Sequence, residues 1–320
     1  MIDLSIIIIN WNSADYLINC IRTIKEHTHL RYEIIVVDNA SYDGCMERLS
    51  DEHNDVIFLQ SDENLGFAGG NNFGFKYASG SVLLFLNPDT EVLNGAIDQL
   101  YKWIRRLPDC GIVGARLLNS DGTLQTTCVR NFPTILGQIL DSSIYRSICP
   151  KSKICGTNVL YQSTDTPSQV DAVSGACLMI KKYIFKSVGG FSSEYFMYSE
   201  DIDLCYKVRK AGYKIYYVPT AEIIHHGGAS SSQSQTDFFA VVMIHRSRYQ
   251  FFKRSRSPLY SKIYRLSVVV SSLLRIGLLL AAWPVMRSRG KGSGPKRRLK
   301  KWAAVLQWAL ALEPWDKERQ

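Results

Sequence analysis

The chain has 320 residues, 46% of them hydrophobic, and a mean hydropathy of −0.07. These values exclude a disordered chain and a protein built mainly of membrane-spanning helices, and they allow one large α/β domain or two small ones. The formal net charge of +9 is unevenly distributed: residues 1–237 carry 20 Lys and Arg against 26 Asp and Glu, and residues 238–320 carry 18 against 3. The sequence therefore predicts a slightly acidic globular body followed by a basic tail, whose positive charge favours binding to phosphate groups.

Strands and helices alternate from the N-terminus. Leu4–Ile9 is a continuous apolar run rich in isoleucine, which is typical of a strand buried on both faces of a parallel sheet. The remaining elements follow in order: a helix over 16–28, a strand over 33–38, a helix through 46–49, a strand over 56–59, a glycine-rich loop over 64–72 that opens a helix, and a strand over 81–86. This alternation predicts right-handed βαβ units and a mostly parallel sheet flanked by helices.

The eight cysteines include no C-x-x-C pair, so a zinc or dithiol redox site is not expected. Most of them lie in apolar runs, where a free thiol packs as a small hydrophobic group. Cys149 and Cys155 are the one pair that could approach each other across a loop. Because the N-terminus has neither a basic segment nor a cleavage site of the secretory type, we expect the body to lie in a reducing cytoplasm.

Polar residues follow three of the predicted strands. They are Asn10-Trp-Asn12, Asp38-Asn39 and Asn87-Pro-Asp89. A single acid at such a place is often only the N-cap of the next helix. The carboxyl ends of parallel strands share one edge of the sheet, however, and ligands bind at that edge. The sequence therefore predicts a ligand site at this edge of the sheet. The glycine-rich segment matches neither the dinucleotide-binding nor the Walker pattern, so it does not identify the ligand.

The second half of the body contains three further features. An apolar strand over 173–180 begins with a turn of small residues, which would allow the backbone to approach a ligand closely. A helix starting near Glu200 has acids in its first turn, which either complement the helix dipole or supply a general base. Two histidines, His225 and His226, follow a strand and precede two glycines, so they are either structural or ligand-binding.

Together these motifs resemble the inverting family-2 glycosyltransferases with the GT-A fold, particularly the rhamnosyltransferase-like branch. The resemblance runs from about Leu4 to Ser231. The motifs that carry it are Asn12, Asp38-Asn-Ala-Ser, the segment Asn64–Asn72, Asn87-Pro-Asp89, Gly175-Ala176, Gly-Gly-Phe191, Glu200-Asp201-Ile-Asp203-Leu and His225-His-Gly-Gly. It implies a Rossmann-like GT-A domain with a nucleotide-sugar-binding half over 1–115 and an acceptor-binding and catalytic half over 116–235.

The resemblance also implies roles for individual residues. The nucleotide site comprises Asn12, Asp38, Asn64, Gly69, Asn87 and Asp89, and Asp38 is expected to bond the pyrimidine base. The family commonly has Asp-x-Asp where this chain has Asn87-Pro-Asp89, so Asp89 is left as the carboxylate for Mg²⁺ or Mn²⁺, with His225 as a second ligand. Asp201 matches the catalytic base, and Glu200 is the alternative. The acceptor is expected to contact Gly175, Ala176, Tyr198 and Asp203.

The tail over 236–320 is predicted to be a helical membrane-associating extension. Residues 266–286 are long enough to span a bilayer, but Arg275 lies at their centre and basic residues flank both ends. An interfacial or re-entrant segment fits better, and a buried helix of the body is the alternative. The basic run 296–301 precedes a second apolar helix, so an anionic membrane surface is the expected partner. Nucleic acid is not, because no RNA- or DNA-binding motif is present.

The sequence thus predicts a metal-dependent inverting glycosyltransferase at the cytoplasmic face of a bacterial inner membrane. The expected donor is a dTDP- or UDP-sugar, with dTDP-rhamnose as first candidate, and the expected acceptor is a lipid-linked surface glycan. A processive polysaccharide synthase would need several membrane spans and a Gln-x-x-Arg-Trp element, which the sequence lacks. A non-catalytic sugar-nucleotide sensor or scaffold is the other alternative, although Asp38, Asp89, Asp201 and His225 are all present.

Overall fold

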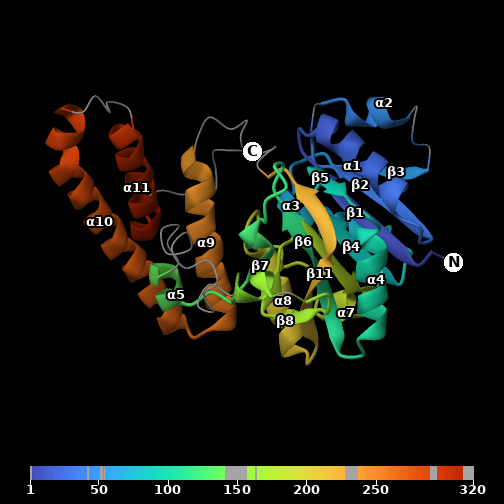
Figure 1. Ribbon diagram of the computed structural model, residues 1–320. Helices are drawn as coiled ribbons and strands as arrows, with labels where there is room; N and C mark the ends of the chain where they lie inside the picture. The colour runs from blue at the N-terminus through green and yellow to red at the C-terminus, as the bar shows by residue number, and fades with distance from the viewer. Residues whose placement is uncertain are drawn as a thin grey trace. The chain divides into compact units, whose positions relative to one another are not determined.

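A computed structural model describes residues 2–41, 43–50, 53, 55–140, 157–162, 164–227, 237–288 and 294–312. The chain divides into two compact units (Figure 1). The first comprises residues 1–196 and 200–232, and the second comprises 197–199 and 233–320. The division of residues 1–235 into a donor half and an acceptor half stays a functional proposal.

The first unit is built on a mixed sheet of nine strands in the described part of the chain. Four parallel strands form one half, in the order β3-β2-β1-β4. They are β1 (Leu4–Asn10), β2 (Tyr32–Asp38), β3 (Val56–Gln60) and β4 (Val82–Leu86). All four predicted strands of this half are confirmed to within a residue or two. Every residue of β1 and β4 is buried, as expected for strands covered on both faces.

The other half of the sheet contains antiparallel strands. It consists of β5 (Thr90–Val92), β6 (Cys110–Leu118), β8 (Ser168–Val170), β10 (Cys177–Lys181) and β11 (Lys214–His225). Strand β10 lies between β4 and β6 and is antiparallel to both, whereas β6 and β11 are parallel. A separate two-stranded ribbon joins β7 (Val129–Arg130) to β9 (Ala172–Val173). The predicted strand over 173–180 is therefore two strands, β9 and β10, separated by a turn at residues 174–176.

The described part of the first unit also contains helices. They are α1 (Ala14–His27), α2 (Cys45–Ser50), α3 (Gly66–Phe75), α4 (Ala96–Arg106), α5 (Ile135–Leu140), α7 (Lys182–Ser187) and α8 (Glu200–Lys210), with short 3₁₀ turns at Thr126–Cys128 and Thr157–Tyr161. Helix α1 buries Leu17, Cys20, Ile21 and Ile24, the spacing from which it was predicted. The six described cysteines are free and buried, as expected, and Cys149 and Cys155 lie outside the described residues.

The prediction of a glycine-rich loop over 64–72 is wrong in part, because α3 already begins at Gly66. A Cβ atom on Gly74 would lie 2.8 Å from Cγ2 of Ile7 and 3.1 Å from Cγ2 of Val37. A Cβ on Gly70 would lie 3.1 Å from Ile9. The glycines therefore let the helix rest directly on β1 and β2. This packing outweighs the low helix propensity of glycine, and propensity is what made the segment resemble a loop.

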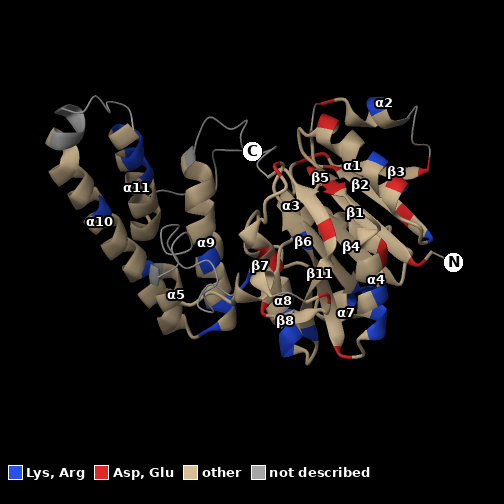
Figure 2. Ribbon diagram, in the orientation of Figure 1, with Lys and Arg blue, Asp and Glu red and all other residues tan. Residues whose placement is uncertain are grey.

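The second unit contains α9 (Asp237–Ser255), α10 (Pro258–Ser288) and α11 (Gly294–Leu310). Helix α10 buries one face, on which Ser261, Tyr264, Val268 and Ser272 lie. Residues Pro258–Pro284 are long and apolar enough to cross a membrane, and 11% of their most apolar window is buried. Because most of this window is exposed, a buried helix of the globular body is not what the structure shows. After Asp237, the first residue of α9, the charged residues of these three helices are all Lys or Arg, as the part drawn in colour shows (Figure 2).

The start of α3 provides a test of close backbone packing. Gly66 has a φ of +67°, and a Cβ there would lie 2.2 Å from the carbonyl oxygen of Phe196. That carbonyl also accepts a hydrogen bond from the N–H of Phe67 at 3.0 Å. We expect Gly66→Ala to lower the free energy of unfolding by about 3 kcal/mol or more, measured by denaturant titration.

Gly122→Ala is the matched control for this substitution. Gly122 has a similar φ of +78°, but no heavy atom lies within 4 Å of the point that a Cβ there would occupy. The free energy of unfolding of Gly122→Ala should therefore fall only by the cost of placing an alanine in the left-handed conformation, about 1–2 kcal/mol. Equal losses for the two variants would show that contact with Phe196 does not constrain the start of α3.

Candidate active site

The carboxyl ends of β1 and β2 bring polar side chains together. Asn10 and Asp38 are register partners, and Nδ2 of Asn10 donates to Oδ1 of Asp38 at 3.2 Å and to Oδ2 of Asp43 at 3.1 Å. Asp43 also accepts hydrogen bonds from the N–H groups of Ala14 and Cys45, so it fixes the starts of α1 and α2. Asp38 is 6% exposed. The structure thus places Asp38 in a buried, hydrogen-bonded position at the carboxyl edge of the parallel strands.

Asp38, Asp43 and Cys45 offer ligand atoms within 4.8 Å of one another, a spacing that a metal ion could use. The Asn10 amide, however, already donates to both carboxylates. Burial and the two nearby carboxylates raise the pKa of the Cys45 thiol to about 12, so it is protonated at neutral pH. This set suits a hydrogen-bonding pocket better than a metal centre.

The other expected nucleotide-binding residues lie in or beside neighbouring segments. Asn12 has a φ of +51°, and its N–H donates to Oγ of Ser41 at 2.8 Å. Oδ1 of Asn64 accepts hydrogen bonds from Nδ2 of Asn39 and from the N–H of Gly66, both at 2.9 Å. Asn64 therefore helps to hold the beginning of α3, and Gly69 lies inside that helix rather than in a loop.

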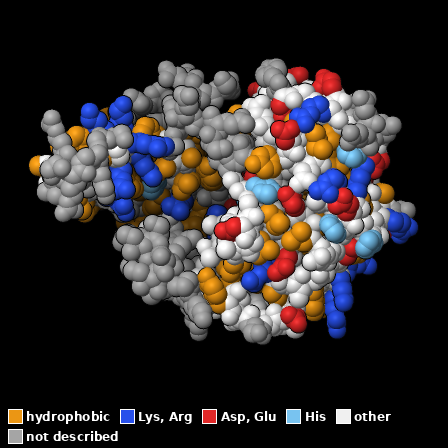
Figure 3. Space-filling view, turned by 45° about the horizontal axis from the view of Figure 1, so that its top comes forward, with side chains coloured by type: hydrophobic (Ala, Val, Ile, Leu, Met, Phe, Trp, Pro, Cys, Tyr) orange, Lys and Arg blue, Asp and Glu red, His pale blue; other side chains and the backbone are white. Residues whose placement is uncertain are grey.

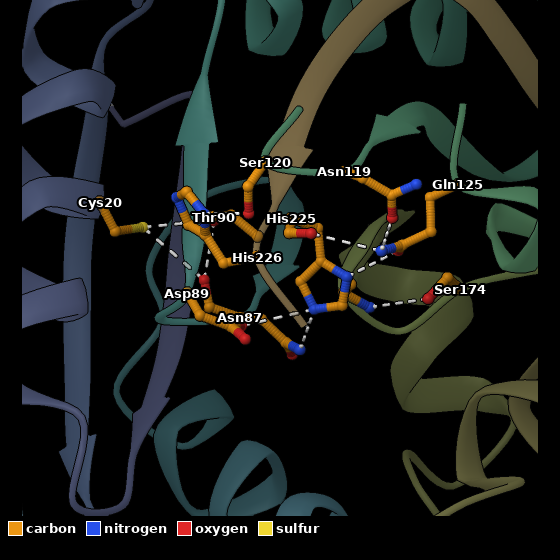
Figure 4. A network of polar contacts seen from close by, with 11 residues as sticks. Cys20, Asn87, Asp89, Thr90, Asn119, Ser120, Gln125, Ser174, His225 and His226 are labelled. Carbon is orange, nitrogen blue, oxygen red and sulfur yellow. Dashed lines mark hydrogen bonds and ion pairs between the residues drawn. The ribbon is translucent and has the colours of Figure 1, made fainter. Parts of the chain in front are cut away.

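The segment Asn87–Asp89 lies beside His225 (Figure 4). Strand β5 follows this segment and pairs with the end of β11, so that His225 lies opposite Thr90. The N–H of His226 donates to the carbonyl of Asp89 at 2.9 Å. Nε2 of His225 lies 3.4 Å from Oδ1 of Asp89 and 3.2 Å from Nδ2 of Asn87. The structure thus brings Asp89 and His225 together, and their binding of a metal ion stays a prediction.

Gln125 determines which ring nitrogen of His225 carries the proton. Its Nε2 donates to Oδ1 of Asn119 at 3.1 Å and to the carbonyl of His225 at 3.3 Å. The other amide atom, Oε1, then faces Nδ1 of His225 at 2.7 Å and can only accept. Nδ1 therefore carries the hydrogen, and the lone pair of Nε2 is directed toward Asp89 and Asn87.

His226 has a different environment from His225. Its Nε2 lies 2.8 Å from Oε1 of Glu91, and its Nδ1 lies 2.8 Å from Oγ of Ser120. The ring also packs on Tyr16, with centroids 5.4 Å apart. Both ring nitrogens are engaged inside the protein, so His226 serves to join β5 to the turn at residue 120.

The turn between β9 and β10 connects two parts of the site. The N–H of Gly175 donates to Oδ2 of Asp201 at 3.0 Å. The carbonyl of Ala176 accepts a hydrogen bond from the N–H of Asn87, also at 3.0 Å. Oδ1 of Asp201 accepts a second bond, from the N–H of Ile202, at 2.8 Å. The turn therefore links the first turn of α8 to the polar end of β4.

Glu200 is buried beside Asp201. Burial, and secondly the charge of Asp201, raise the pKa of the Glu200 carboxyl to about 8. Its Oε2 has no hydrogen-bond partner among the described residues. Near neutral pH, Glu200 is therefore a neutral acid next to the carboxylate of Asp201.

Two residues expected to contact the acceptor have other surroundings. Both carboxylate oxygens of Asp203 accept hydrogen bonds inside the first unit, from Ser192 at 2.6 Å and from Tyr195 at 3.3 Å, and Lys207 lies 3.6 Å away. Tyr198 has a φ of +69° and groups with the second unit. We propose a positioning role for Asp203, and acceptor binding by Tyr198 stays a prediction.

Comparison with known proteins agrees with this architecture. The model of glycosyl transferase family 2 matches residues 5–188, and that of the N-terminal domain of galactosyltransferase matches residues 157–227. The low-salt glycan biosynthesis hexosyltransferase Agl10 of Haloferax volcanii is 29% identical over 289 residues, which cover 89% of this chain and 84% of the relative. An N-acetylglucosaminyl-diphospho-decaprenol L-rhamnosyltransferase of Mycobacterium tuberculosis is 26% identical and covers 89% and 95%.

A solved structure shows the same fold. The mannosyltransferase PcManGT of Pyrobaculum calidifontis, in complex with GDP-Man and Mn²⁺, superposes with a TM-score of 0.58 at 17% identity, covering 98% of this chain and 88% of that one. The first unit is thus a GT-A domain. Because the family model covers more than half of the sequence, the chain belongs to glycosyl transferase family 2, and it is a glycosyltransferase.

The raised pKa of Glu200 predicts a pH dependence of stability. The folded protein binds this proton more tightly than the unfolded chain, whose carboxyl has its ordinary pKa of 4.5. Stability is therefore lost as the pH rises from the ordinary value toward about 8, by at most about 1.4 kcal/mol per pH unit. Glu200→Gln cannot ionise, so its denaturation midpoint should fall less than that of the wild type between pH 5.5 and 8.

Glu26→Gln is the control, because Glu26 is exposed and pairs only with Arg22 on the surface of α1. Its midpoint should follow the wild-type pH profile. A Glu200→Gln profile parallel to that of the wild type would show that Glu200 ionises at its ordinary pKa in the folded protein.

Proposed function

We propose that this glycosyltransferase is inverting and transfers a sugar, with rhamnose as first candidate, from a nucleoside-diphosphate donor to a hydroxyl of a lipid-linked bacterial glycan. The observation that carries the proposal is the turn at residues 174–176. It joins the carboxylate of Asp201 to the segment that contains Asp89. A base and a diphosphate-binding carboxylate held by one short turn suit the two ends of a displacement reaction.

In this proposal, Asp38 at the end of β2 binds the base of the donor. The carboxylate of Asp38 is held by the Asn10 amide and can accept the imide N–H that uracil and thymine share. A dTDP- or UDP-sugar therefore fits. The relative from M. tuberculosis is named an L-rhamnosyltransferase, which supports rhamnose as the sugar to test first. Its named acceptor is a decaprenyl-diphosphate glycan, which supports a lipid-linked acceptor for this chain.

Asp89 and His225 would hold Mn²⁺ or Mg²⁺. Their nearest ligand atoms are 3.4 Å apart, and with the hydrogen on Nδ1 the Nε2 lone pair of His225 can bind an ion in exchange for its hydrogen bond from Nδ2 of Asn87. When bound, the ion supplies positive charge to the diphosphate as it leaves. Asn87 contributes an uncharged amide where the family commonly has a carboxylate.

Asp201 takes the proton of the acceptor hydroxyl while the new glycosidic bond forms. Two backbone N–H groups hold its carboxylate in a fixed orientation. Glu200 beside it is neutral near pH 7, so the negative charge of the pair resides on Asp201. This favours Asp201 over Glu200 as the base. Attack on the face opposite the leaving diphosphate inverts the anomeric centre.

The second unit supports a place at the cytoplasmic face of a bacterial inner membrane. Helix α10 exposes apolar side chains over much of its length, and residues 238–312 contain no acid. A protein with these features associates with the surface of an anionic bilayer. That location would also present the enzyme to a lipid-linked acceptor.

The proposal is tested by label transfer. Bacterial membranes are incubated with the protein, Mn²⁺ and each member of a panel of labelled nucleotide sugars, and the lipid extract is counted. We expect transfer from one dTDP- or UDP-sugar, loss of transfer with chelator, and a loss of at least about 10³-fold for Asp201→Asn.

Nucleoside-diphosphate binding by the same Asp201→Asn protein is the control, and it should be nearly unchanged. Equal loss of binding and transfer would contradict a role for Asp201 as base. Binding by the wild type without transfer from any donor to membranes of several bacteria would favour the sensor or scaffold alternative.

Gln125 provides a test of the metal site that does not depend on turnover. Gln125→Leu removes the acceptor that holds Nδ1–H of His225, so we expect Mn²⁺ binding, measured by electron paramagnetic resonance, to weaken about 10- to 100-fold. Gln125→Glu keeps an acceptor at that position and should retain most of the affinity. Equal affinity in all three proteins would show that Gln125 does not orient His225 for an ion.

A further inference from the structure

Cationic side chains gather around one tryptophan of the second unit. The guanidinium of Arg275 on α10 lies 4.4 Å from the ring centroid of Trp302 on α11, and Nζ of Lys301 lies 5.9 Å from the same ring. Arg297 and Arg298 are close enough that their charges, after burial and together with that of Arg275, lower the pKa of Lys301. Burial contributes most to this lowering and repulsion by the neighbouring cations comes second, so several positive charges lie close together around Trp302.

The chain does not supply the counter-charge among its described residues. No Asp or Glu occurs between residues 238 and 312 of the sequence. Within the described ranges, no carboxylate forms an ion pair with Arg275, Arg298 or Lys301. The polar contact of Arg275 is the hydroxyl of Ser271, which accepts from Nε at 3.3 Å.

Arg265, in contrast to Arg275, has backbone carbonyl groups as hydrogen-bond acceptors. Nε and Nη2 of Arg265 donate to the carbonyls of Ala309 and Trp308 at 2.8 and 3.1 Å, at the C-terminal end of α11. Arg265 meets the end of α11, whereas Arg275, ten residues further along α10, meets Trp302 in its middle, so α10 and α11 form an antiparallel pair. Arg265 thus secures one end of the pair, and the cluster around Trp302 lies toward the other.

The outer face of α10 is an exposed apolar stripe. Its side chains recur with helical spacing along the face opposite the buried one, and they remain 46–71% exposed. They are Leu259, Ile263, Leu266, Val270, Leu273, Leu274, Leu278 and Leu280. Figure 3 shows hydrophobic and basic side chains adjoining each other on the surface of this unit. A row of exposed apolar side chains of this length marks an interaction site.

We propose that the α10–α11 pair docks on a bilayer that contains anionic phospholipid, with the apolar stripe of α10 among the acyl chains and Arg275, Arg298 and Lys301 bound to lipid phosphate beside Trp302. This inference rests on the membrane association proposed above and assigns it to particular residues. The two features together select the partner. A nucleic acid would neutralise the cations but leave the stripe in water, and a second copy of the chain would cover the stripe but add further positive charge.

Vesicle binding by the full-length protein tests the proposal. The vesicles are phosphatidylcholine alone or phosphatidylcholine with about one third phosphatidylglycerol, and binding is measured by sedimentation. The cluster variant is Arg275→Gln/Arg298→Gln/Lys301→Gln. The matched control, Lys253→Gln/Arg256→Gln/Lys262→Gln, removes the same charge from exposed residues of α9, α10 and the turn between them.

We expect the wild type to prefer phosphatidylglycerol vesicles, and the cluster variant to lose at least tenfold more affinity for them than the control variant. Equal losses would overturn the phosphate site, because general charge attraction would then explain binding. Leu274→Ser/Leu278→Ser should weaken binding to both kinds of vesicle. If it instead leaves vesicle binding unchanged and converts a dimer to a monomer, the stripe is a contact between copies and the proposal fails.

Two further measurements separate this proposal from others. Nucleoside-diphosphate binding, which depends on the first unit, is measured on every variant and should be unchanged, so a failure of vesicle binding is distinguishable from a failure of the proposed reaction. A short duplex oligonucleotide is tested as competitor. Tight oligonucleotide binding that needs the cluster, without vesicle binding by the wild type, would overturn the proposal in favour of nucleic acid.

Discussion

The chemistry of the first unit depends on how closely one three-residue turn approaches its neighbours. At residues 174–176 the backbone bonds the Asp201 carboxylate on one side and the start of the Asn87–Asp89 segment on the other. A Cβ at Gly175 would lie 3.3 Å from Cβ of Asp201 and 3.4 Å from the ring of Phe67. A side chain there would crowd Cβ of Asp201, whose carboxylate accepts the hydrogen bond from the N–H of Gly175. The absence of a side chain at Gly175 therefore fixes the distance between the two ends of the site.

A second constraint places the histidine. The short strand β5 follows Asp89 immediately and pairs with the last residues of β11. This antiparallel pairing places His225 at the carboxyl edge of the parallel half of the sheet. Gln125 then orients the ring through the hydrogen bond between its Oε1 and Nδ1 of His225. The site is therefore assembled from chain segments that are distant in sequence, and sheet pairing supplies the rigidity that each loop lacks.

Features that depend on neighbouring residues in the sequence could be predicted, whereas features that depend on contacts between distant segments could not. Apolar runs ending in Asp38 and Asp89 define buried strands and a shared edge, because strand burial and side-chain period are local properties. Asp43 was within reach of sequence reasoning, since it follows Asp38 at the start of a helix, where acids are common. Gln125 gave no signal, because its importance comes from a contact with a residue a hundred positions away. The same is true of α3, whose glycines are explained only by the strands beneath them.

The first unit has buried acids at its site, and the second unit has an excess of cations. The first therefore favours a positively charged partner, and the second a negatively charged one. Asp38, Asp89 and Asp201 are buried at one edge of a sheet, so a donor diphosphate arriving there would meet charges of its own sign. A divalent cation between Asp89 and His225 would remove that conflict. The second unit has an excess of cations around Trp302 and no acid between residues 238 and 312, and an apolar stripe lies on the other face of α10. There the missing component is an anion attached to hydrocarbon, which is the chemistry of a phospholipid. In these proposals, a divalent cation would complete the acidic site of the first unit, and an anionic lipid surface would complete the basic second unit.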